Sequence, residues 1–186
     1  MRRKSIPFAL GALMLTAPVF AVDVDVKFIA TIVQPTCDMS VIPYGGSNIS
    51  NAGTNAYKLT IPDIRLDQLR AKGAESQANF TLKPANCNGL TGLKTTIKAE
   101  KTSTEQPVLA IPSSATGKAS NIGVAFRRQS SSDDVYFGLN NNTTIVWTAD
   151  EMSKGLNLSA AMREVTPNTG TIGPFDAKVT FNFTYE

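Results

Sequence analysis

The two residues with the most definite chemistry are Cys37 and Cys87, the only cysteines in the 186-residue sequence. In an exported chain, an even pair of cysteines most simply forms one disulfide, and this spacing excludes a redox C-x-x-C motif. In the chain-entropy description, closing a loop of this length stabilises the fold by roughly 4 kcal/mol. That contribution is comparable to the net stability of a small domain.

Histidine is absent from the sequence, which removes the usual general base, the usual zinc ligand and the Ser-His-Asp arrangement. Gly117-Lys118 does not complete a phosphate-binding loop, because Pro112 stands where that motif requires a glycine. An exported enzyme is therefore the third and remotest of three functional interpretations.

Two acidic pairs, Asp133-Asp134 and Asp150-Glu151, are the remaining candidates for metal or acid/base chemistry. Neighbours in sequence do not share a face of a strand, so solvated turns are favoured for both pairs over a metal or acid/base site. Trp147, the sole tryptophan, is expected in the core rather than on a sugar-stacking surface. We expect no catalysis, no metal and no cofactor.

Residues 1–21 have the pattern of a secretory signal peptide. Arg2, Arg3 and Lys4 precede an apolar run, and Val19-Phe20-Ala21 supplies a small-residue cleavage pattern. The alternative is a membrane anchor, but the run is short and contains Pro7 and Pro18. We expect cleavage after Ala21 and export of the mature chain.

Removing the signal peptide makes the chain formally neutral. Three of its 18 Lys and Arg residues are in residues 1–21 and no acid is, so the remaining 15 cations balance 15 acids. No basic stripe remains to favour nucleic acid. The remaining length suits a single domain, which we assign to residues 34–186.

The first and last stretches of the mature chain both alternate with the period of a β-strand. In the first, residues 22–33, the alternating apolar positions are Val22, Val24, Val26, Phe28, Ala30 and Ile32. In the last, residues 175–186, they are Phe175, Ala177, Val179, Phe181, Phe183 and Tyr185. The opposite face of residues 22–33 begins polar and then turns apolar, which predicts a half-exposed first half and a second half buried on both sides.

The residues between these stretches contain several more short strand patterns separated by turn signals. Strands are predicted around residues 57–61, 78–82, 93–99, 108–111, 122–126, 135–139, 144–147 and 156–162. Residues 62–70 favour one or two helical turns, whereas residues 38–47 and 127–134 are predicted as turns. Nine or ten short strands indicate an all-β sandwich.

Together, several motifs resemble the chaperone-usher pilins of the type 1 fimbrial family over essentially the whole mature chain. They are the cysteine after the first strand, the segment Phe80-Thr-Leu-Lys-Pro-Ala-Asn-Cys87, the segment Asn121-Ile-Gly-Val-Ala-Phe126, Gly173 fourteenth from the end and Tyr185 second from the end. The resemblance implies an incomplete immunoglobulin-like sandwich whose hydrophobic groove is filled by a donor strand from another subunit.

The resemblance also implies partners and site residues. Residues 22–33 become a donor-strand extension for a neighbouring subunit, with Val24, Val26, Phe28, Ala30 and Ile32 inserting. The groove edge and chaperone contact become Val179, Phe181, Phe183, Tyr185 and Glu186. The implied partners are a periplasmic chaperone, an outer-membrane usher and neighbouring pilus subunits, and the implied location is a cell-surface fimbrium.

One position departs from the family pattern. Many members carry a glycine where this sequence has Ala30, which indicates either a roomier partner groove or a different register. The short extension resembles that of adapter subunits near a pilus tip. Two alternatives remain: a single-domain adhesin that binds a host receptor such as a glycan, and a complete sandwich in which residues 22–33 are simply the first strand.

Overall fold

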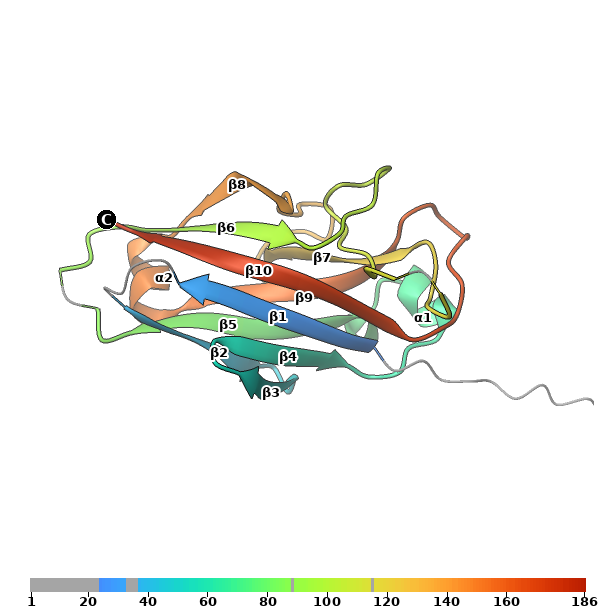
Figure 1. Ribbon diagram of the computed structural model, residues 1–186, viewed down its shortest axis with the longest axis horizontal. Coiled ribbons are helices and arrows are strands. Elements are labelled where there is room, and N and C mark those ends of the chain that lie inside the picture. The colour runs from blue at the N-terminus through green and yellow to red at the C-terminus, as the bar shows by residue number, and fades with distance from the viewer. Residues whose placement is uncertain (1–23, 33–36, 88, 115) are drawn as a thin grey trace, which may run out of the picture.

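The computed structural model describes the backbone of residues 24–32 and residues 37–87, 89–114 and 116–186, which form two packed β-sheets (Figure 1). The predicted signal peptide lies outside these residues. The strands are β1 (Val24–Ile32), β2 (Asp38–Tyr44), β3 (Asn48–Gly53), β4 (Ala56–Ile61), β5 (Gln77–Ala85), β6 (Leu93–Ala99), β7 (Ile122–Arg128), β8 (Asn140–Val146), β9 (Leu156–Glu164) and β10 (Phe175–Tyr185). The predicted all-β sandwich is confirmed.

One sheet has the strand order β3-β4-β1-β10-β6-β8 and the other has the order β2-β5-β9-β7. The strand β1 pairs parallel with β10 and antiparallel with β4. The remaining pairings between described strands are antiparallel. The first and last strands of the domain therefore lie side by side and point the same way (Figure 1).

The core lies between the sheets and is built from the inward-facing alternate residues of their strands. Phe80 of β5, Phe126 of β7 and Phe181 of β10 meet edge to face at its centre, with ring centroids 5.7 to 6.3 Å apart. Trp147 is buried, and its indole N–H donates to the Thr95 hydroxyl at 2.8 Å. Its predicted place in the core is confirmed.

Short helices lie outside the sheets. The helix α1 (Leu66–Arg70) confirms the helical turn predicted in residues 62–70, and a 3-10 turn, η1 (Ala74–Ser76), follows it. The helix α2 (Ala149–Lys154) was not predicted from the sequence. Thr148 and Glu151 form a capping box at its start, which is the signal that identifies it.

Four sequence predictions were wrong in detail. Residues 38–47 were predicted as a turn, but residues 38–44 form β2, whose Pro43 lies in an edge strand where a missing N–H is tolerated. Residues 127–134 were also predicted as a turn, yet Arg127 and Arg128 belong to β7. Residues 135–139 form no strand, and residues 108–111 contribute only bridges at Ala110.

Candidate functional site

The candidate functional site is the position between β4 and β10, which we call the slot and which β1 occupies in this structure. On one side, β10 buries Phe175, Ala177, Val179, Phe181 and Phe183 in the core. On the other side, β4 buries Leu59 and Ile61. A strand in the slot therefore completes the hydrogen bonding of two strand edges directly above the core.

The five predicted donor residues lie along the slot in register with the buried residues of β10. The Cα partners are Val24 with Phe175, Val26 with Ala177, Phe28 with Val179, Ala30 with Phe181 and Ile32 with Phe183. The predicted alternation of side-chain burial within residues 24–32 lies outside what the structure describes. The register nevertheless aligns the apolar set of β1 with the apolar set of β10.

The predicted groove-edge residues divide into two groups. Val179, Phe181 and Phe183 are buried beneath the slot. A strand in the slot therefore contacts this part of β10 along its backbone edge. Tyr185 and Glu186 lie at the end of the slot instead. The structure thus brings the predicted donor and groove residues together. Within the groove set, it places three residues in the core beneath the slot and two at the end of the slot.

Several contacts hold the end of β10 at this end of the slot. The Tyr185 hydroxyl donates to the Cys37 carbonyl at 3.5 Å, and Cys37 is joined to Cys87 by a disulfide, as predicted. Burial and the charge of Asp38 raise the pKa of the Tyr185 hydroxyl. Beyond Tyr185, the Glu186 side chain pairs with Lys94, and its backbone exchanges two hydrogen bonds with Gly92.

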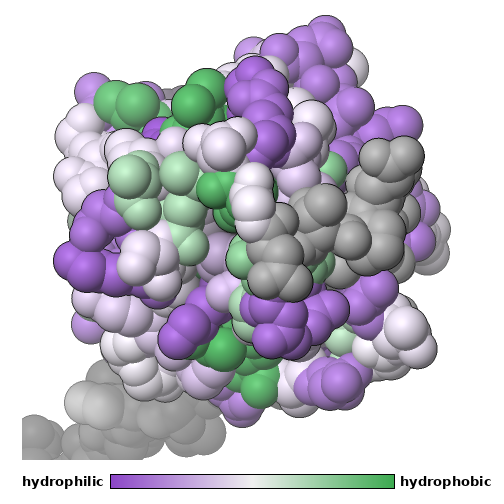
Figure 2. Space-filling view, turned by 90° about the vertical axis from the view of Figure 1, so that its left-hand side faces the viewer, coloured by the Kyte–Doolittle hydropathy of each residue, from purple (hydrophilic) through white to green (hydrophobic). Residues whose placement is uncertain are grey.

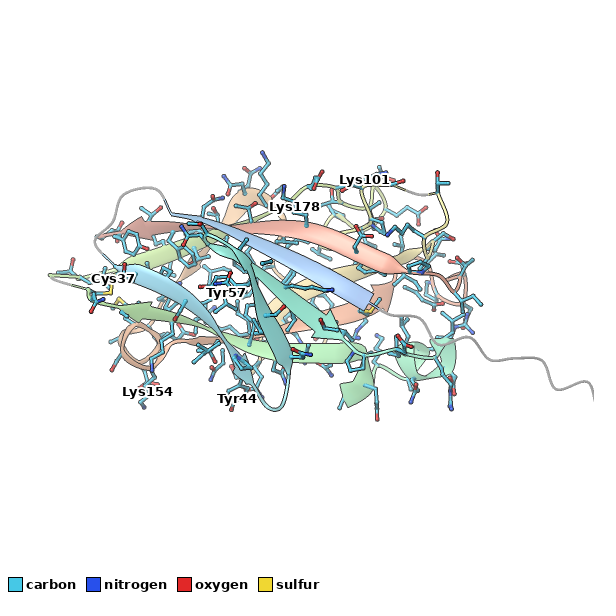
Figure 3. The ribbon with its side chains drawn as sticks, turned by 60° about the horizontal axis from the view of Figure 1, so that its bottom comes forward. Cys37, Tyr44, Tyr57, Lys101, Lys154 and Lys178 are labelled. Atoms are coloured by element: carbon cyan, nitrogen blue, oxygen red, sulfur yellow. A yellow bond between two sulfur atoms is a disulfide. The ribbon has the colours of Figure 1, made fainter. Side chains whose placement is uncertain are left out.

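This end of the molecule is polar and mixed in character. Hydrophobic residues form small, separate patches among hydrophilic ones (Figure 2). Cys37 is labelled at the end where β1 finishes, and Tyr57 is labelled on β4, where it is the Cα partner of Phe28 (Figure 3).

An apolar hollow lies at the opposite end of the slot, where β10 begins. Its lining includes Ile64, Leu66, Ile172 and Phe175, and the Ile172 side chain is 57% exposed. Gly173 lies beside it with a φ of +156°, and a Cβ there would stand 2.6 Å from the Ala119 backbone nitrogen. A side chain at this position has no room because the chain passes directly against residues 118–119. The hollow was not predicted from the sequence.

The acidic pairs serve structural purposes. Asp133 forms hydrogen bonds with the guanidinium of Arg163, and Glu151 accepts from Arg128 at 2.7 Å while capping α2. Partial burial raises the pKa of the Glu151 carboxyl, but Arg128 and the start of α2 outweigh it, so the pKa lies below its ordinary value. Asp150 pairs with Lys154 one turn along α2. Asp133 and Asp134 lie in a turn, as predicted, although Asp133 is only partly exposed. Asp150 and Glu151 lie in α2, so the prediction of a turn was wrong for that pair.

The described residues contain no group of three or more His, Cys, Asp and Glu side chains that could hold a metal ion. No helix among them is long and apolar enough to cross a membrane. Within this part of the chain, the slot is the feature whose geometry suggests a function.

Comparison with known proteins agrees with the fold. Residues 26–186 match the family described as fimbrial protein. The chain is also 37% identical over 182 residues to the uncharacterized fimbrial-like protein YadM of Escherichia coli strain K12, covering 95% of this chain and 94% of that protein.

The chain belongs to the fimbrial protein family, and it is a chaperone-usher fimbrial subunit. This family consists of structural proteins rather than enzymes, and its members interact with other subunits of the pilus. Its members are exported through the periplasm to a surface fimbrium.

Proposed function

We propose that this chain is a structural pilus subunit that assembles by donor-strand exchange and supports cell adhesion. The observation that carries the proposal is the slot between β4 and β10, where a single added strand completes a sheet over the core. In the fibre, residues 22–33 of a neighbouring subunit fill this slot. Residues 34–186 form the accepting domain.

The physical basis is β-strand addition. An unfilled slot leaves two strand edges unpaired and exposes the core beneath them. An added strand supplies main-chain hydrogen bonds, and its alternate side chains give specificity. Each large apolar side chain that becomes fully buried contributes roughly 1.5 to 3 kcal/mol.

A periplasmic chaperone acts before the neighbour does. It supplies the missing strand to the newly exported domain, and the outer-membrane usher then receives the complex. The backbone edge of β10 opposite Val179, Phe181 and Phe183 gives the chaperone its line of contact. Tyr185 and Glu186 mark the end of that line.

The test is a chain lacking residues 22–32, expressed with the chaperone and usher of the fimbria that contains it. We expect the truncated chain to form a one-to-one complex with the chaperone, because its slot is intact. It should reach fibres only as a terminal subunit, because it has no strand to donate. Incorporation at internal positions would contradict the proposal.

Point substitutions within the extension provide a matched comparison. Phe28 belongs to the alternating apolar set, and its neighbour Lys27 does not. Phe28→Ser should reduce fibre incorporation strongly, whereas Lys27→Ser should leave it close to that of the unsubstituted chain. The fraction of subunits in SDS-resistant multimers measures both.

A further inference from the structure

A polar hollow lies on the outer face of the four-stranded sheet, which is the sheet that does not contain the slot. Several segments line it: the end of α1, the loop that leads to Ala110, the chain after β7, the end of β9 and the loop that follows β9. Its volume is about 550 Å³, within the range of about 300 to 1,000 Å³ that is usual for small-molecule sites.

The base of the hollow is rigid. Arg163 follows the core residue Met162 on β9, so its side chain leaves from the opposite face of the sheet. Arg163 is buried, and its guanidinium donates to the Tyr136 hydroxyl at 3.0 Å. Tyr136 also packs against an apolar cluster that contains Leu109 and Val165. The tyrosine ring is therefore held in place, and it is only half-buried where it lines the hollow.

Two ion pairs balance most of the charge around the hollow. Asp133 pairs with Arg163, and Glu164 pairs with Arg70 across the end of α1. Glu164 also accepts the backbone N–H of Asn168, which fixes the loop after β9. These groups hold the surrounding segments together, so the shape of the hollow is set before any ligand enters.

Lys72 and Asp134 line the hollow as exposed charged groups outside these two ion pairs. The Asp134 carboxylate accepts a hydrogen bond from the Ser132 hydroxyl at 2.6 Å, and a carboxylate has room for several more. This hydrogen bond lowers the pKa of the Asp134 carboxyl, and the charge of Lys72 lowers it further. The two opposite charges are therefore within electrostatic reach of each other at one hollow.

This lining favours an uncharged ligand that carries hydroxyl groups. An anion attracted by Lys72 would be repelled by Asp134, and a cation would meet the reverse. A hydroxyl both donates and accepts, so neighbouring hydroxyls can serve the carboxylate and the ammonium together. A sugar ring has such hydroxyls around its edge and C–H groups on its faces. The half-buried ring of Tyr136 offers the apolar surface that those C–H groups require.

We propose that this hollow binds a neutral carbohydrate, with Asp134 accepting from sugar hydroxyls, Lys72 donating to them and Tyr136 packing against the apolar face of the ring. The hollow and the slot belong to different sheets, so a bound sugar does not compete with the strand in the slot. The inference rests on the adhesive part of the proposed function, for which it names a ligand class and a site. It does not depend on donor-strand exchange.

The test is binding of the mature chain to an array of neutral oligosaccharides built from glucose, galactose, mannose and N-acetylhexosamines. We expect at least one of them to bind saturably, and titration calorimetry with that oligosaccharide then measures its Kd. Asp134→Asn and Lys72→Gln should each weaken binding about tenfold or more, because each removes a charged partner of a sugar hydroxyl. Both residues are exposed, so thermal unfolding should be unchanged.

The exposed ion pair of α2 provides matched controls. Asp150→Asn and Lys154→Gln make the same chemical changes outside the hollow, and they should leave the Kd unchanged. Equal losses in the two sets of variants would overturn the site, as would the absence of saturable binding to every neutral oligosaccharide. Binding of acidic glycans alone, weakened by Lys72→Gln and strengthened by Asp134→Asn, would overturn the assignment of a neutral ligand.

Fibre incorporation separates this inference from the proposed structural function. Asp134→Asn and Lys72→Gln should enter SDS-resistant multimers as the unsubstituted chain does, because the slot and the extension are unchanged. Loss of incorporation would show that the hollow is an assembly contact with another subunit, which would overturn the carbohydrate site. Normal incorporation without sugar binding would also overturn the carbohydrate site, and it would leave the structural function standing.

Discussion

Arg127 and Arg163 are both buried on the outer face of the four-stranded sheet, and both lie close to one carboxylate. Arg163 donates to Asp133 and, at 3.0 Å, to the hydroxyls of Ser76 and Tyr136. The Arg127 Nε lies 3.7 Å from Asp133 without a hydrogen bond. Asp133 thus balances two buried cations, and a buried charge without its partner is strongly destabilising.

Asp133→Asn should lower the free energy of unfolding by about 2 kcal/mol, because it removes the charge that both arginines face. The measurement is urea unfolding of the mature chain followed by tryptophan fluorescence. Asp134→Asn is the matched control, since Asp134 is the exposed neighbour and its side chain accepts a hydrogen bond from the Ser132 hydroxyl. Equal losses in the two variants would refute this role for Asp133.

Two carboxylates, those of Asp133 and Glu164, predict how the stability of the domain depends on pH. Partial burial raises the pKa of the Asp133 carboxyl, but hydrogen bonds and charge from Arg163 outweigh this effect. Partial burial likewise raises the pKa of the Glu164 carboxyl, but the backbone N–H groups of Asn168 and Gly170, together with Arg70, outweigh it. Both pKa values therefore lie below their ordinary range. Their stabilisation is complete above the unfolded pKa near 4 and is lost as the pH falls through the lowered folded values.

We expect the free energy of unfolding to decrease as the pH is lowered from about 5 to about 3, and to decrease less steeply in Asp133→Asn. Urea unfolding at several pH values measures both slopes. Parallel curves for the two proteins would show that Asp133 does not contribute to the acid sensitivity.

Among the secondary-structure elements, β10 begins just after a backbone position, Gly173, that only a glycine fits well. Its φ of +156° disfavours other residues, and a Cβ there would meet the Lys118 and Ala119 backbone, which a side chain cannot push aside. The Ala119 N–H donates to the Pro174 carbonyl at 3.0 Å, which fixes the two segments together. The glycine noted in the sequence for its position thus has a steric reason.

Gly173→Ala should destabilise the domain by about 2 to 4 kcal/mol, because both the backbone conformation and the close contact oppose it. Gly46→Ala is the control, since Gly46 has a φ of +86° but open space around it. That substitution should cost about 1 kcal/mol. Thermal unfolding of both variants measures the two losses of stability. A loss in Gly46→Ala as large as that in Gly173→Ala would exclude the contact with the Lys118–Ala119 backbone as the cause.

Sequence patterns predicted the strands that carry an apolar signal and missed those that lack one. Residues from β5, β6, β7 and β9 were each predicted as strand. The strand β6 buries alternate side chains, whereas β7 and β9 are buried along almost their whole length. The strand β3 is an edge strand rich in Asn, Ser and Gly, so it has no hydrophobic signal. The strand β2 was obscured by Pro43, which is a turn signal that an edge strand also accepts.

At the scale of the whole molecule, the predicted donor stretch and the last strand were found side by side. The family resemblance implies that this stretch fills the groove of another subunit, whereas the structure places it beside the last strand of its own chain. The parallel direction could not be predicted, because an alternating pattern has the same faces in both directions. It depends on the short linker to Cys37 and on the fixed position of Cys37 at the end of β10.

A domain whose slot is empty should not be independently stable. Deleting residues 22–32 leaves one edge of β4 and one edge of β10 unpaired at the centre of the six-stranded sheet, and the expected loss is comparable to a domain's entire stability of about 5 to 15 kcal/mol. We expect the truncated chain alone to aggregate without a cooperative thermal transition, and a peptide of residues 22–33 to restore that transition saturably. The same peptide with Phe28→Asp should fail, because a charge replaces an apolar residue of the alternating set. A truncated chain that unfolds cooperatively at the same temperature as the mature chain would show that the slot needs no strand, and the donor-strand function would then have no structural basis.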